Sequence, residues 1–284
     1  MRVPRRRFYG RGDLHFVTFS REQRHSAWQQ FGTEPAEAAL PFRDGSKTVT
    51  GLLSAAEARS LENSMDMFDE RYLLIGFIYY VAFLFSTTCH EAAHALAAKL
   101  GGDMTAAEGG QVSLNPVPHI RRSPYGMVVF PLLSFFLLHG SMIGFASAPY
   151  NPDWARRHPH RSALMALAGP ATNFTLMLLA ALALRVGSSM QLIHWNLYGP
   201  HDFAGTALYV MFSLNLLLGV FNLLPVPPLD GSSAIMLLMP EDSARGYMDW
   251  MRSGSFAMPG LLAGLLIFRY IFPPVESFVQ SLLL

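Results

Sequence analysis

Apolar residues gather into five blocks along the chain, and the first block begins only after about seventy residues. The blocks cover residues 72–100, 125–149, 163–186, 206–224 and 258–272. The third and fourth are the cleanest, each near the roughly 20 apolar residues that a helix needs to cross a bilayer. Pro131, Gly140 and Gly144 interrupt the second block, and the fifth is shorter. The pattern predicts a polytopic membrane protein.

The N-terminal part has a different character. Residues 1–70 are polar and Arg-rich, with Arg5, Arg6 and Arg7 in succession, and they show no sustained helical or strand period. Segments of this composition cannot bury enough apolar surface to fold alone. We therefore expect a mostly disordered extension over residues 1–70, with one short helix near 54–67, followed by a membrane-embedded domain over residues 71–284.

Composition narrows the class of protein. Hydrophobic residues make up 51% of the 284-residue chain and charged residues only 14%, whereas soluble domains carry about a quarter charged residues. A formal net charge of +1 gives no indication of a nucleic-acid partner. The single cysteine, Cys89, excludes an intrachain disulfide and a thiolate metal cluster.

The first apolar block contains the sequence His90-Glu91-Ala92-Ala93-His94. Four residues are just over one helical turn, so both imidazoles project from one face, separated by roughly 6 Å along the axis. Such a pair can hold zinc, which lowers the pKa of water toward about 7, and Glu91 beside it can act as the general base. A structural polar cluster is the alternative. Ionisable groups at membrane depth are costly, which favours a metal site.

Two histidines leave a zinc ion short of a third protein ligand. Asp230 is the candidate, because it follows an apolar helix and the proline-broken stretch Pro225-Val226-Pro227-Pro228. The alternative is that Asp230 caps the next helix, expected over residues 231–239. Beside the histidine pair, the ligand interpretation is the stronger one. His119, which follows Pro118, could also approach the metal but is more commonly a polar loop residue.

The two motifs HEAAH and NLLPVPPLDG together resemble those of the site-2 protease family of intramembrane zinc metalloproteases. The sequence AGPATN at residues 168–173 resembles a third element of that family, and GGQVSLNPVPHI at 109–120 resembles the membrane-associated hairpin of its small bacterial members without PDZ or CBS domains. The resemblance implies His90, His94 and Asp230 as ligands of one Zn²⁺, with Glu91 as general base. It also implies that Asn222 steadies the tetrahedral oxyanion.

The predicted fold is an all-α polytopic membrane protein: a bundle of four to five membrane helices with a re-entrant segment and a small β-hairpin near the active site. His90 and His94 lie toward the end of the first block, and Asp230 lies just after the fourth. These two helices must therefore run parallel, with an odd number of crossings between them. The broken block 125–149 is the one we expect to be re-entrant, since broken backbone at membrane depth is tolerated where protein covers it.

Charges in the connecting segments support that arrangement. It places most connector cations on one side, namely Lys99, Arg121, Arg122, Arg156, Arg157, Arg161, Arg245 and Arg252, whereas the opposite loop, residues 187–205, has no Lys or Arg. The positive-inside rule then predicts a multi-pass protein of the cytoplasmic membrane with its active site toward the cytoplasm. This arrangement places the Arg-rich N-terminus outside, against the positive-inside rule. Translation starting near Met65 would remove that conflict. If all five blocks cross, Arg121 and Arg122 fall outside instead.

The function predicted from sequence is therefore that of an intramembrane zinc metalloendopeptidase that cuts membrane-spanning protein substrates within the lipid bilayer. A non-catalytic membrane protein that binds zinc or clients is the alternative, and the presence of Glu91 argues against it. A zinc transporter would need ionisable residues along several helices, whereas here they cluster. Substrate identity and oligomeric state leave no signature in the sequence.

Overall fold

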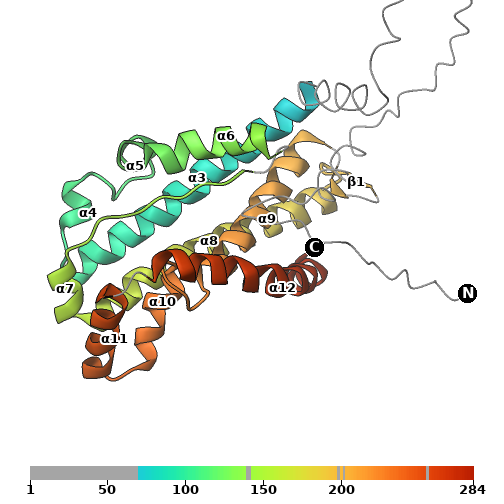
Figure 1. Cartoon of the computed structure of the whole chain (residues 1–284). Coiled ribbons are helices and arrows are strands. Elements are labelled where there is room, and N and C mark those ends of the chain that lie inside the picture. Colours follow the sequence, from blue (N-terminus) through green and yellow to red (C-terminus); the bar gives the residue numbers. More distant parts are fainter. Residues whose placement is uncertain (1–69, 139–141, 197–198, 201, 254–255) are drawn as a thin grey trace, which may run out of the picture.

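A computed structural model describes residues 70–138, 142–196, 199–200, 202–253 and 256–284 (Figure 1). This part of the chain is mostly helical, and four of its helices are long and apolar enough to cross a membrane, as the block pattern predicted. They are α3 (Glu70–Gly101), α8 (Pro159–Ser189), α9 (Phe203–Asn222) and α12 (Ala257–Leu283). The N-terminal extension and its short helix lie outside the described residues, except for Glu70, which begins α3.

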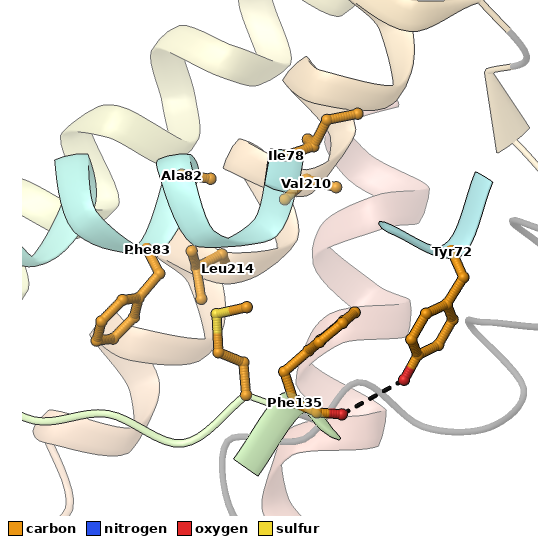
Figure 2. Close-up of a cluster of buried hydrophobic side chains, with 8 residues drawn as sticks. Tyr72, Ile78, Ala82, Phe83, Phe135, Val210 and Leu214 are labelled. Carbon is orange, nitrogen blue, oxygen red and sulfur yellow. Dashed lines mark hydrogen bonds between the residues drawn. The ribbon is translucent and has the colours of Figure 1, made fainter. Parts of the chain in front are cut away.

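Helices α3 and α9 run parallel, with α8 antiparallel to both. Ile78 of α3 lies beside Val210 of α9, and Phe83 lies in the same buried cluster as Leu214, so residue numbers rise together along the two helices (Figure 2). Against α8 the order reverses, because His90 meets Asn173 and His94 meets residue 165. The parallel direction of α3 and α9 is the one that the ligand geometry required.

The second apolar block forms the π-helical turn η3 (Tyr125–Val129) and helix α6 (Phe130–Leu137). Together they are about 20 Å long, which is too short to cross the roughly 30 Å bilayer core. The Phe135 ring packs on Tyr72, near the start of α3, with ring centres 4.7 Å apart, and the Tyr72 hydroxyl donates to the Phe135 carbonyl at 3.3 Å (Figure 2).

The chain then returns without regular structure beside α3 (Figure 1). On the way back, the Phe145 N–H donates to the Gly126 carbonyl at 3.0 Å. At the far end, the Asn151 N–H donates to the Asp103 carboxylate at 2.7 Å, just beyond the end of α3. The start of the segment therefore lies beside its return limb, and the return limb ends just beyond the C-terminal end of α3.

The β-hairpin expected over residues 109–120 is not formed. The segment is flanked by helix α4 (Thr105–Glu108) and contains helix α5 (Pro116–Arg122), with turns between them. The Asn115 side chain caps α5 by accepting from the Val117 N–H at 3.0 Å. Pro116 and Pro118 have no N–H to donate to a β-ladder, whereas a proline suits the first turn of a helix. The hairpin prediction was wrong for this reason.

One observed helix, α3, ends where the apolar pattern predicted, and two others differ from the predicted ranges. Gly102 stops α3 with a positive φ of 101°, which glycine adopts without strain, and the Asp103 N–H donates to the Ala98 carbonyl at 2.9 Å. The helix expected over 231–239 is divided into α10 (Asp230–Ala234) and the 3₁₀ turn η4 (Ile235–Leu238). Helix α12 continues past residue 272 through Pro273 and Pro274, as apolar membrane helices tolerate.

The remaining elements lie at the two ends of the bundle (Figure 1). Helices α7 (Pro152–Arg157) and α11 (Glu241–Ser253) lie at the same end as α10, joined by the Arg156–Asp249 ion pair at 3.0 Å. At the other end, strands β1 (Trp195–Asn196) and β2 (Gly199–Pro200) pair antiparallel between α8 and α9.

Candidate metal centre

Three ionisable residues in the second half of α3 lie inside the protein. His90, Glu91 and His94 are all buried. The two imidazole Nε2 atoms lie 2.9 Å apart, and the ring planes meet at 83°. The expectation that residues 90 and 94 project from one helical face is therefore met.

Asp230 comes to the same point from a segment 140 residues away. Its Oδ2 lies 3.1 Å from His90 Nε2 and 3.3 Å from His94 Nε2. The alternative assignment of Asp230 as a helix cap is wrong, because Leu229 is the N-cap of α10 and the Asp230 carboxylate lies against the imidazoles. The structure thus brings together the three residues proposed from sequence.

The loop before Asp230 is held by close backbone packing. A side chain at Gly231 would collide with the carbonyl of Leu223, and one at Gly260 of α12 would collide with the carbonyl of Pro227. The Leu229 carbonyl accepts from the Ser232 hydroxyl at 2.7 Å. Glycines at these two contacts allow the loop to sit close against α9 and α12, which fixes where the carboxylate emerges.

Each imidazole is oriented by a bond from its other nitrogen. His94 Nδ1 donates to the backbone carbonyl of Met165 at 2.7 Å, because a carbonyl can only accept. His90 Nδ1 lies 2.6 Å from Asn173 Oδ1. With protons on both Nδ1 atoms, both Nε2 atoms present lone pairs toward Asp230.

Three lone-pair donors that converge in this way suit a cation. Ligands about 2.0–2.1 Å from a tetrahedral zinc ion lie about 3.3 Å from one another, close to the separations of 2.9 to 3.3 Å found here. Two imidazole nitrogens and one carboxylate oxygen are ordinary ligands of zinc, so the donor set fits zinc.

Glu91 differs from its neighbours in having a buried oxygen without a partner. Among the described residues, none bonds to Glu91 Oε2. Leaving a buried polar atom unpaired costs free energy, so such an atom calls for an explanation. A role in binding substrate or water is one such explanation. The position of this oxygen is consistent with the general-base role expected for Glu91.

Two other residues weighed from sequence lie outside the cluster. The Asn222 Nδ2 donates to the Leu218 carbonyl within its own helix at 3.0 Å. His119 is buried in α5, with its Nε2 2.9 Å from the Ser113 carbonyl, and is not part of the group formed by His90, His94 and Asp230. The structure gives His119 no role at the centre.

Gly169 and Asn173 are the residues for which sequence reasoning found no definite role. A side chain at Gly169 would collide with the rings of both His90 and His94. The two residues are four apart in α8 and therefore lie on one face. The four-residue spacing of Gly169 and Asn173 within AGPATN was the signal in the sequence that could have indicated a shared role at the metal centre.

Comparisons with known proteins agree with this geometry. The model of peptidase family M50 matches residues 78–249. The candidate zinc metalloprotease YwhC of Bacillus subtilis is 32% identical over 163 residues, which cover 56% of this chain and 68% of YwhC. The candidate zinc metalloprotease Rip2 of Mycobacterium tuberculosis is 34% identical over 152 residues, 54% of this chain and about half (53%) of Rip2. No solved structure matches the chain.

We predict that Gly169→Ala reduces the zinc content of the purified protein well below one ion per chain, because the added methyl group would displace both imidazoles. Metal analysis after removal of loosely bound ions measures this. Gly246→Ala is the matched control, since a side chain there meets open space. A folded Gly169→Ala protein with full zinc content would contradict the close approach.

Proposed function

The chain belongs to peptidase family M50, the site-2 protease family, and we propose that this zinc metalloprotease cuts membrane-spanning proteins at the cluster of His90, His94 and Asp230. Its four candidate spans fit a multi-pass membrane protein. The observation that carries the proposal is the convergence of three donor atoms within 3.3 Å of one another, from segments on α3 and after α9. The unpaired carboxylate oxygen of Glu91 lies on the same helix.

In this proposal His90, His94 and Asp230 hold one Zn²⁺, the metal in the names of both relatives. Bound zinc supplies a Lewis acid, which polarises a carbonyl and makes water a stronger acid. Asp230 brings a negative charge that offsets part of the charge of the ion. The Nδ1 bonds of the two histidines keep their Nε2 lone pairs pointed at the site.

Glu91 moves the proton. Its carboxylate takes a proton from the attacking water as the water oxygen bonds to the scissile carbonyl carbon. It then delivers that proton to the amide nitrogen as the C–N bond breaks, so that the products are a carboxylic acid and an amine. Burial supports this role, because bulk water does not compete for the carboxylate.

Asn222 would stabilise the negative charge that develops on the carbonyl oxygen during attack. Its position at the end of α9, eight residues before Asp230, supports this assignment. Its amide donates to Leu218 in the described structure, so it would exchange that bond for the oxyanion when substrate binds. Donors of this kind act only when they reach the position of the developing charge.

The segment from η3 to Asn151 would be re-entrant from the cytoplasmic side. Its short helix supports this, as do the Phe145–Gly126 bond between its two limbs and the position of Asn151 just beyond the C-terminal end of α3. The basic residues of α5, α7 and α11 then lie on the cytoplasmic side, as the positive-inside rule favours, and the active site faces that side of the cytoplasmic membrane.

The first test is Glu91→Gln, which keeps the shape of the side chain but removes its basicity. We expect cleavage to fall by at least about 10²-fold, the lower range for a general base, while the protein still binds one zinc ion. Membrane proteomes of cells with either form show which proteins accumulate uncut. Glu108→Gln, an exposed carboxylate in α4, is the matched control. If no membrane protein accumulates uncut in cells with Glu91→Gln, the alternative is favoured, a non-catalytic zinc- or client-binding protein.

Asn222→Ala tests the oxyanion role separately. We expect turnover to fall by about 10²–10³-fold with zinc content unchanged, because the lost donor acts on the transition state and not on the metal. Turnover is measured on a substrate identified from the proteome comparison. Wild-type turnover would show that another donor serves the oxyanion.

Labelling tests the re-entrant segment. In a Cys89→Ser background, single cysteines at Arg121, Tyr150 and Met190, all exposed positions, are treated with an impermeant maleimide in vesicles of known orientation. We expect residues 121 and 150 to react from the cytoplasmic side and 190 from the opposite side. Reaction of 121 and 150 from opposite sides would mean that the segment crosses the membrane.

A further inference from the structure

We propose that Asn173 is a positioning residue of the metal centre, and that a buried pair of amides fixes which nitrogen of His90 faces the metal. We call Asn173 and Asn215 the amide relay. Both side chains are completely buried, at 0% exposure, between α3, α8 and α9. The inference rests on the proposed zinc site and adds residues that touch neither metal nor substrate.

The amide relay is part of a continuous chain of hydrogen bonds that joins four side chains, from His90 to Ser86. His90 Nδ1 lies 2.6 Å from Asn173 Oδ1, and Asn173 Nδ2 donates to Asn215 Oδ1 at 2.9 Å. Asn215 Nδ2 donates in turn to the Met211 carbonyl at 2.8 Å and to the Ser86 hydroxyl at 2.9 Å. All four distances are those of good hydrogen bonds, so each amide group of the relay has a partner.

The Met211 carbonyl sets the direction of every bond in the relay. A backbone carbonyl can only accept, so Asn215 must turn its NH₂ group toward it and its oxygen toward Asn173. That oxygen also only accepts, so Asn173 must present its NH₂ to Asn215 and its own oxygen to His90. His90 Nδ1 must therefore carry the proton, which leaves a lone pair on Nε2 for a metal ion.

His94 reaches the same state by a different route. Its Nδ1 donates directly to the Met165 carbonyl at 2.7 Å. The main chain therefore fixes one ligand and side chains fix the other. If the Asn173 amide were absent or reversed, only His90 would lose its preference for presenting Nε2 to the metal.

The test uses the full chain purified in detergent. Zinc affinity is measured by competition with a chelator, and the visible spectrum of the cobalt-substituted protein reports the ligand geometry. Asn173→Leu keeps the size of the side chain and removes its hydrogen bonds. We expect zinc affinity to fall about 10–100-fold, as for other partners of metal-binding histidines, with an altered cobalt spectrum. Asn173→Asp keeps an oxygen toward His90 and should restore much of the affinity.

Thr172→Val is the matched control, because the Thr172 hydroxyl bonds only within its own helix, to the Ala168 carbonyl at 3.0 Å. Circular dichroism of the metal-free proteins identifies variants that fail to fold. If Asn173→Leu is one of them, Asn215→Leu decides. It frees the Asn173 amide to reverse and should also weaken zinc binding, by a smaller factor.

The outcomes separate the relay from the site itself. Folded variants with wild-type zinc affinity and an unchanged cobalt spectrum would overturn the relay and leave the proposed protease intact. A wild-type protein that binds no zinc would overturn the site and the relay together. Weaker binding in the relay variants, with the Thr172 control unchanged, supports the inference.

Discussion

The arrangement of the helices follows from the need to hold a carboxylate and two imidazoles together inside an apolar bundle. Taking charged groups out of water costs several kcal/mol unless they are paired and hydrogen-bonded. His90, His94 and Asp230 meet that condition only when the end of α9 lies beside the second half of α3. Two parallel neighbours require one antiparallel crossing between them, and α8 makes it. The same helix supplies the bonds that orient both imidazoles.

The short segment with η3 and α6 is a consequence of the same constraint. In the proposed topology this segment does not cross the membrane, because a crossing would point α3 and α9 in opposite directions and carry Asp230 away from the histidines. Its α6 limb places Phe135 against Tyr72 (Figure 2). Its return limb ends at Asp103. The three packed helices keep their relative direction, and the loop of Asp230 stays on the side of the histidines.

Much of this could be predicted from the sequence because its signals are local or depend on spacing. The four spans follow from runs of apolar residues, and the position of His90 and His94 on one face follows from helical geometry. The hairpin prediction failed because a resemblance was preferred to the chemistry of Pro116 and Pro118. The partnership of Asn173 with His90, 83 residues away in sequence, could not be predicted, because it depends on how helices α3 and α8 are rotated against each other. The meeting of Asp230 with the two histidines could be predicted only together with HEAAH, because the local sequence around Asp230 equally suits a helix cap.

The two histidines differ in how far sequence drift can affect them. The acceptor of His94 belongs to the main chain of residue 165, and every amino acid at that position, proline included, still offers a carbonyl oxygen. The acceptor of His90 is the side chain of Asn173, whose direction is set through Asn215. A codon change at Asn173 removes the acceptor, and one at Asn215 removes the bond that fixes its direction. Substitutions at residues 173 and 215 can therefore alter the orientation of the His90 imidazole. No substitution at residue 165 removes the acceptor that orients His94.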